Sequence, residues 1–81
     1  MIDEADFVAS LQVLFREELD QANLVIDMDT SKDNLDLWDS LAHVRLVIGI
    51  ERMLGIQFDV SEIESIDSVR GFYEAAKNHL R

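Results

Sequence analysis

Three side chains with nucleophile or acid–base chemistry lie close together in this sequence: the carboxylate of Asp39, the hydroxyl of Ser40 and the imidazole of His43. Residues three apart on a helix can be neighbours, so a serine activated by a histidine is the first chemistry to consider. Such a nucleophile also needs an oxyanion hole and an oriented base. The glycines, at 49, 55 and 71, are distant from Ser40, and no Gly-x-Ser-x-Gly motif is present. The pattern argues against an enzyme.

Ser40 is predicted to lie at the start of a helix, because an apolar pattern of helical spacing follows it. Either Asp39 or Ser40 can serve as the N-cap of this helix. The backbone N–H groups and the dipole at a helix N-terminus favour a phosphate, so a serine attached through a phosphodiester suits the position. A simple capping role is the alternative, and these residues taken alone favour it.

The stretch begins with Asp-Ser-Leu at positions 39–41 and continues along the predicted helix with Val44, Leu46, Val47, Ile50 and Glu51. This combination resembles the acyl carrier protein family, and the resemblance extends without gaps from Leu37 to Val69. It implies that Ser40 carries 4′-phosphopantetheine, attached by a phosphopantetheinyl transferase. It also implies that Asp39 helps that transferase recognise the site and that Leu41 is an apolar docking contact.

By the same resemblance, the protein shuttles a thioester-bound intermediate between an acyl- or aminoacyl-loading ligase and downstream acyl-transfer enzymes, in lipid or polyketide biosynthesis. Two alternatives stay open. One is a free-standing peptidyl or aminoacyl carrier, which has the same arm and a different cargo. The other is an unmodified, carrier-like bundle that serves as a structural subunit.

The composition indicates one small domain over residues 1–81, with 48% hydrophobic residues, which is well above the level of disordered chains. The net charge of −10 argues against nucleic acid and anionic membrane as partners. Cys is absent, and the two histidines, His43 and His79, are too isolated to suggest a metal site. The acidic start lacks the regions of a signal peptide, so we expect a cytoplasmic protein. We also expect it to be a monomer.

The helical pattern predicts an all-α fold: a small antiparallel four-helix bundle with three longer helices, one short helix and a long first loop. The first helix is expected from residue 3 to about 18, and the connection over 19–39 should be pinned across the helices by its apolar residues. The second helix is expected from Ser40 to about Leu54.

Two shorter segments complete the expected bundle. Ser61 and Glu64 have capping-box spacing, which predicts a short third helix over residues 61–66. The last helix should begin after a cap at Asp67 or Ser68.

The second helix is expected to carry two different apolar surfaces. Its core stripe consists of Leu46, Val47, Ile50, Met53 and Leu54. A neighbouring flank is the candidate partner-docking face: Leu41, Val44 and Ile48, bordered by Arg45 and Arg52.

The charge of this helix departs from the family pattern. General fatty-acid carriers tend to present several acids along it, whereas residues 40–55 here contain two Arg against one Glu, a sum of +1. The acidic residues lie in the flanking segments. The pattern favours a dedicated biosynthetic pathway over general fatty-acid synthesis.

Trp38 and His43 are both expected to pack in the interior. Trp38 stands where many carriers have a small residue, and it should help to hold the loop onto the bundle. His43 projects toward the apolar side of its helix, where its imidazole must be hydrogen-bonded. Members of this family can tuck an acyl chain between helices, and such a chain would threaten that pairing. We therefore expect a short or polar cargo held outside the bundle.

Overall fold

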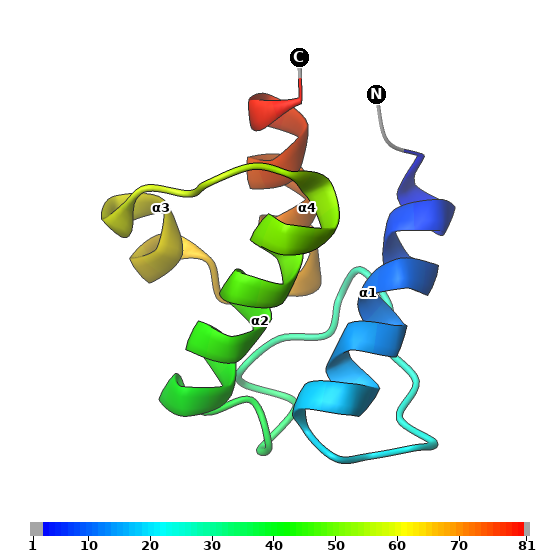
Figure 1. Cartoon of the computed structure of the whole chain (residues 1–81). Coiled ribbons are helices and arrows are strands. Elements are labelled where there is room, and N and C mark those ends of the chain that lie inside the picture. Colours follow the sequence, from blue (N-terminus) through cyan, green and yellow to red (C-terminus); the bar gives the residue numbers. More distant parts are fainter. Residues whose placement is uncertain (1–2, 81) are drawn as a thin grey trace.

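The computed structural model describes residues 3–80, which contain four helices and no strand (Figure 1). They are α1 (Glu4–Glu18), α2 (Ser40–Leu54), α3 (Val60–Ser65) and α4 (Val69–His79). The helix α3 has only six residues, and a long connection over residues 19–39 joins α1 to α2. The expected all-α bundle, with three longer helices, one short helix and a long first loop, is confirmed.

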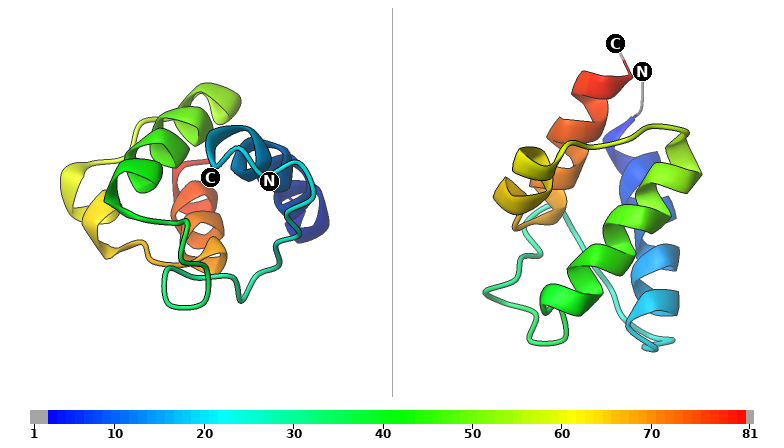
Figure 2. Two further views of the ribbon diagram at one scale, coloured as in Figure 1. Left: turned by 90° about the horizontal axis from the view of Figure 1, so that it is seen from below. Right: turned by 60° about the vertical axis from the view of Figure 1, so that its left-hand side comes forward.

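The directions of the helices place the start of α2 at one end of the bundle. In Figures 1 and 2, α1 runs opposite to α2 and to α4, and it packs against both. The first turn of α2 therefore lies near the last turn of α1, at the end of the molecule away from the start of α1 and the end of α4 (Figure 1). None of the helices within residues 3–80 is long and apolar enough to cross a membrane.

The core forms where the apolar faces of α1, α2 and α4 meet. In α1 the buried residues are Phe7, Leu11 and Phe15, and the predicted stripe of α2 is buried at Leu46, Val47 and Ile50. Met53 was expected in the core but is 39% exposed, so this part of the prediction is wrong. By its direction Met53 lies between the buried Ala42 and Leu46, but it stands in the last turn of α2, so its position along the helix and not its direction leaves it exposed.

A glycine allows the close approach of α1 to α2. A Cβ atom placed on Gly49 would lie 2.5 Å from Cδ1 of Leu14. The close neighbour of Gly49 is therefore a side chain of α1. Gly55 follows Leu54 and ends α2 with a left-handed backbone, φ 67°, which glycine adopts readily.

The short helix α3 begins earlier than expected. Its N-cap is Asp59, and a capping box joins Asp59 to Glu62, whereas Ser61 with Glu64 had been predicted to form one. The Ser61 hydroxyl instead donates a hydrogen bond to the Asp59 carboxylate. The helix spans 60–65 because two overlapping pairs of residues share the capping-box spacing, and the earlier pair forms the box. Ser68 caps α4, as one of the two predicted candidates.

The long connection is pinned to the bundle, as expected. Ile26 is 4% exposed, and its backbone N–H donates to the side-chain oxygen of Gln12 on α1. The start of α4 is also tied to it, because the N–H groups of Val69 and Arg70 donate to the carbonyls of Thr30 and Met28. The loop that precedes Ser40 is therefore held by both α1 and α4.

Candidate functional site

Asp39 is the residue that caps α2. It has an extended backbone, and its carboxylate accepts a hydrogen bond of 2.9 Å from the N–H of Ala42. Ser40 is the first residue of the helix and is exposed. Within residues 3–80 its hydroxyl has no hydrogen-bond partner. The simple capping role that competed for Ser40 thus belongs to Asp39, and the serine hydroxyl is left accessible.

The first turn of α2 also presents free backbone donors. An N-terminal turn has N–H groups without partners inside the helix. Asp39 accepts from Ala42, but among the described residues nothing accepts from the N–H groups of Ser40 and Leu41. These two donors and the helix dipole make this end favourable for an anion bound to Ser40.

Trp38 fixes the chain just before this turn. Its indole is 2% exposed, meets the Phe15 ring edge to face at 5.1 Å, and stacks on Phe72 at 5.7 Å between ring centroids. Three elements are involved, since Phe15 belongs to α1 and Phe72 to α4. Core packing of Trp38 is confirmed, and it anchors the end of the long connection.

His43 is buried one helical turn after Ser40, and both of its ring nitrogens are hydrogen-bonded. The indole N–H of Trp38 donates to Nδ1 at 3.0 Å, so the proton of the neutral ring is on Nε2, which donates to the carbonyl of Ile63 at 2.8 Å. Burial lowers the pKa of His43, and the positive charge of Lys32 lowers it further, while the hydrogen bond to the Ile63 carbonyl raises it. The ring is therefore neutral at pH 7.

The arrangement does not form a hydrolase triad. The carboxylate of Asp39 accepts a hydrogen bond from the backbone of α2, and the nitrogens of His43 pair with Trp38 and Ile63. Neither group is therefore hydrogen-bonded to the Ser40 hydroxyl as a catalytic base would be. Among residues 3–80, no group of three or more His, Asp or Glu side chains is placed to hold a metal ion.

The five predicted docking residues form one exposed surface, here called the α2 face: Leu41, Val44, Arg45, Ile48 and Arg52. Leu41 is 61% exposed, Val44 51% and Ile48 43%. Neither arginine makes an ion pair with any of the described residues. The surface is apolar with two unpaired positive charges, on a chain whose net charge is −10.

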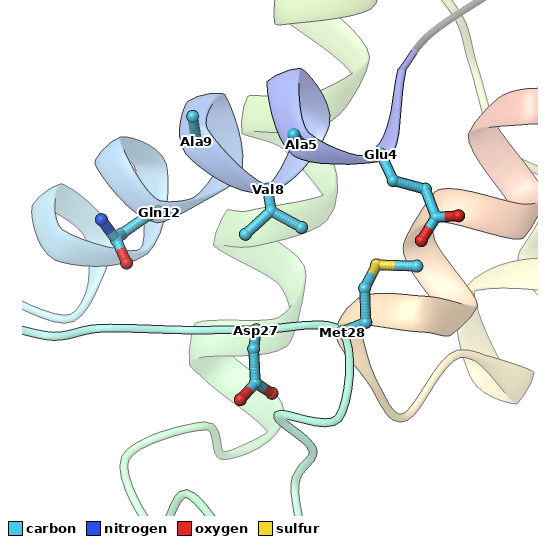
Figure 3. A pocket seen from close by; sticks show the side chains of 7 residues that line it. All are labelled: Glu4, Ala5, Val8, Ala9, Gln12, Asp27 and Met28. Carbon is cyan, nitrogen blue, oxygen red and sulfur yellow. The ribbon is translucent and has the colours of Figure 1, made fainter.

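Two of the hollows on the surface formed by residues 3–80 are relevant to the site. The smaller, of about 170 Å³, adjoins Ser40 and is lined by residues of α1, the loop and α2: Glu18, Leu19, Leu37, Asp39, Leu41, Ala42 and Arg45. The larger, of about 390 Å³, lies between the first half of α1 and the long connection. Figure 3 shows Val8 and Met28 pointing into it from its two sides.

One partner in this region could not be found from the sequence. His43 was expected to need a hydrogen bond, but its acceptor is the backbone carbonyl of Ile63, twenty residues further along the chain. A backbone group leaves no mark in residue type. The only available signal was the presence of a polar side chain on the apolar side of the helix.

The chain is thus a small four-helix bundle that presents a serine at the start of its second helix, after a long pinned loop. Among solved structures the chain matches a holo acyl carrier protein from Geobacter metallireducens, determined by solution NMR. The TM-score is 0.80 and the identity 27%, over 91% of this chain and 85% of that chain. The chain thus has the fold of an acyl carrier protein, and the resemblance to that family is confirmed. No family model matches the chain, and no curated protein matches it.

Proposed function

We propose that this protein is an acyl carrier that bears 4′-phosphopantetheine on the hydroxyl of Ser40 and holds an acyl group as a thioester on that arm. The observation that carries the proposal is the exposed, unpaired hydroxyl of Ser40 at the N-terminus of α2, with the cap supplied by Asp39. The similar protein from Geobacter metallireducens is described as holo. The proposed role is transport of an intermediate, not catalysis.

The residues present fit a phosphodiester at Ser40. The free N–H groups of Ser40 and Leu41 can hydrogen-bond its oxygens, and the positive end of the α2 dipole favours its charge. When bound, the arm supplies the thiol that forms the thioester. The chain contains no Cys that could compete with this thiol.

Recognition by enzymes is assigned to the residues around the serine. Asp39 and Leu41, both exposed, are proposed to contact the phosphopantetheinyl transferase. The α2 face is proposed to dock the loading ligase and the downstream acyl-transfer enzymes. Because Arg45 and Arg52 are unpaired and exposed, an acidic enzyme surface complements them. The positive charge of Arg45 and Arg52 favours, as partners, the enzymes of a dedicated biosynthetic pathway over those of general fatty-acid synthesis.

The proposal further includes a single domain that acts as a monomer in the cytoplasm.

The decisive experiment is modification in vitro. The purified protein is incubated with coenzyme A, Mg²⁺ and a broad-specificity phosphopantetheinyl transferase, and its intact mass is measured. We expect a gain of one phosphopantetheinyl group, which Ser40→Ala abolishes. Ser61→Ala is the matched control, since Ser61 is another exposed serine in the first turn of a helix. A folded wild-type sample that gains no mass would sink the carrier proposal and favour a structural subunit.

A further inference from the structure

A chain of two hydrogen bonds lies close in sequence to Ser40, at a histidine one helical turn further along α2. It runs from the indole of Trp38 to Nδ1 of His43, at 3.0 Å, and from Nε2 of His43 to the carbonyl of Ile63, at 2.8 Å. Trp38 ends the long connection, His43 belongs to α2 and Ile63 to α3. This Trp38–His43–Ile63 bridge therefore joins three elements around the candidate attachment site.

The space around the bridge is filled. The rings of Trp38, His43 and Phe72 stack with centroids 5.5–5.9 Å apart, and Phe58 packs against Phe72 at 6.5 Å. Each of these four side chains is 5% exposed or less. Among the described residues, no buried side-chain nitrogen or oxygen lacks a partner. The interior between α2 and α3 thus has its polar groups satisfied.

An alkyl chain that entered between α2 and α3 would have to separate His43 from Ile63 or displace Trp38. Either movement leaves an indole N–H, an imidazole nitrogen or a backbone carbonyl unpaired in apolar surroundings, which costs free energy. The chain would also have to displace close-packed aromatic rings. A short acyl chain buries too few methylene groups to offset these costs.

We infer that the Trp38–His43–Ile63 bridge keeps the carried group outside the bundle, so that the cargo is a short or polar acyl group. The inference rests on the proposed function, because it concerns the group attached through Ser40. The hollow that flanks Ser40, of about 170 Å³, lies on the surface and thus outside the bundle, and its lining combines charged residues with the apolar Leu19, Leu37, Leu41 and Ala42. Trp38 and His43 act in this scheme as specificity-determining residues.

The test compares two loaded forms of the full chain. The apo protein is loaded from acetyl-coenzyme A or octanoyl-coenzyme A by a transferase that accepts both, and ¹H–¹⁵N NMR spectra are recorded. Trp38 is the only tryptophan, so its indole N–H gives one unambiguous signal for the bridge. We expect this signal, and the amides of Val47 and Ile50, to have the same positions in the two forms. Octanoyl-specific shifts at these groups would place the chain between the helices and overturn the inference.

Two further outcomes are informative. Octanoyl-specific shifts at Val8 and Met28 would place the chain in the larger hollow beside α1 (Figure 3) and would equally overturn the inference. Absence of any acyl mass gain would defeat the proposed function instead. In that case Ser40→Cys, alkylated with N-octylmaleimide or N-methylmaleimide, presents an alkyl chain directly from residue 40, without the arm, and tests whether the interior admits such a chain. The chain has no other Cys, so labelling is confined to one site, and the same signals report burial.

A variant without the bridge tests its causal role. The double substitution Trp38→Phe with His43→Leu removes both buried polar side chains together, which avoids leaving one of them without its partner. We expect octanoyl-specific shifts at Val47 and Ile50 in this variant and none in the wild type. If the folded variant also leaves these signals unchanged, the bridge does not decide where the cargo lies. If the variant fails to fold, the wild-type comparison alone decides the inference.

Discussion

Leu14 of α1 packs over Gly49 of α2 so closely that a side chain on the glycine would overlap it. A Cβ atom at Gly49 would lie 2.5 Å from Cδ1 and 2.8 Å from Cδ2 of Leu14. This contact brings a side chain of α1 against the backbone of α2. It also explains a glycine in the interior of a helix, where it costs roughly 1 kcal/mol relative to alanine.

The sign of the stability change caused by Gly49→Ala should therefore depend on the residue at position 14. In the wild type we expect destabilisation, because overpacking costs about 1–3 kcal/mol and exceeds the gain in helix propensity. In a Leu14→Ala background the overlap disappears, and Gly49→Ala should stabilise by up to about 1 kcal/mol. Urea unfolding of the four proteins in this double-mutant cycle measures both effects. Equal effects of Gly49→Ala in the two backgrounds would show that Leu14 does not restrict the glycine.

The sequence predicts those parts of this fold that local chemistry determines. The sequence limits the N-cap of α2 to Asp39 or Ser40, because an acidic residue and a hydroxyl residue stand before the apolar pattern. The choice between them depends on backbone geometry, which gives the cap to Asp39. The start of α3 was misplaced for a related reason, since Asp59 with Glu62 and Ser61 with Glu64 have the same spacing.

Contacts between distant segments were harder to predict. A helical wheel places Met53 in the core stripe, but burial also depends on which elements cover each level of the helix, and Met53 in the last turn of α2 remains 39% exposed. The candidate site was predictable at Ser40 and Asp39, where a motif marks it. The bond from His43 to the Ile63 carbonyl was not, because it joins a side chain to a distant backbone group.

The buried histidine should make stability depend on pH. Burial lowers the pKa of His43 in the folded state below its ordinary value of 6.5. Below about pH 6.5 the unfolded chain then binds more protons at this position than the folded one, so the free energy of unfolding falls as the pH decreases. The limiting slope for one group is about 1.4 kcal/mol per pH unit. Above about pH 7, His43 adds no pH dependence to the free energy of unfolding.

Chemical unfolding at pH values from 7.5 to 5.5 measures this dependence. His43→Gln, which cannot titrate, should lower the stability but flatten its fall over this range. His79→Gln is the matched control, because His79 is an exposed residue that pairs with Glu62 and lies outside the Trp38–His43–Ile63 bridge. A His43→Gln protein whose stability falls as steeply as that of the wild type would contradict the assignment to His43.

Asp39 combines a structural and a proposed recognition role, which two substitutions can separate. Asp39→Ala removes the cap and should cost about 0.5–2 kcal/mol of stability. Asp39→Asn keeps an oxygen that can accept from Ala42 and should change the stability little, because Asn and Asp are similar as N-caps. We expect both variants to be modified more slowly by the transferase, since both lack the carboxylate. If Asp39→Asn is modified as fast as the wild type, the charge plays no part in recognition.

The two arginines of the α2 face give the last prediction. Arg45 and Arg52 are exposed and have no ion-pair partner within residues 3–80, so reversing their charges should leave the folding stability nearly unchanged. If they face an acidic enzyme surface, Arg45→Glu with Arg52→Glu should slow acyl loading by a cognate enzyme at low salt. High salt screens exposed charges and should narrow the difference from the wild type. Arg70→Glu serves as the control, because Arg70 is an exposed arginine on α4. Loading rates of the double variant that match those of the wild type at both salt concentrations would show that partners do not use this face.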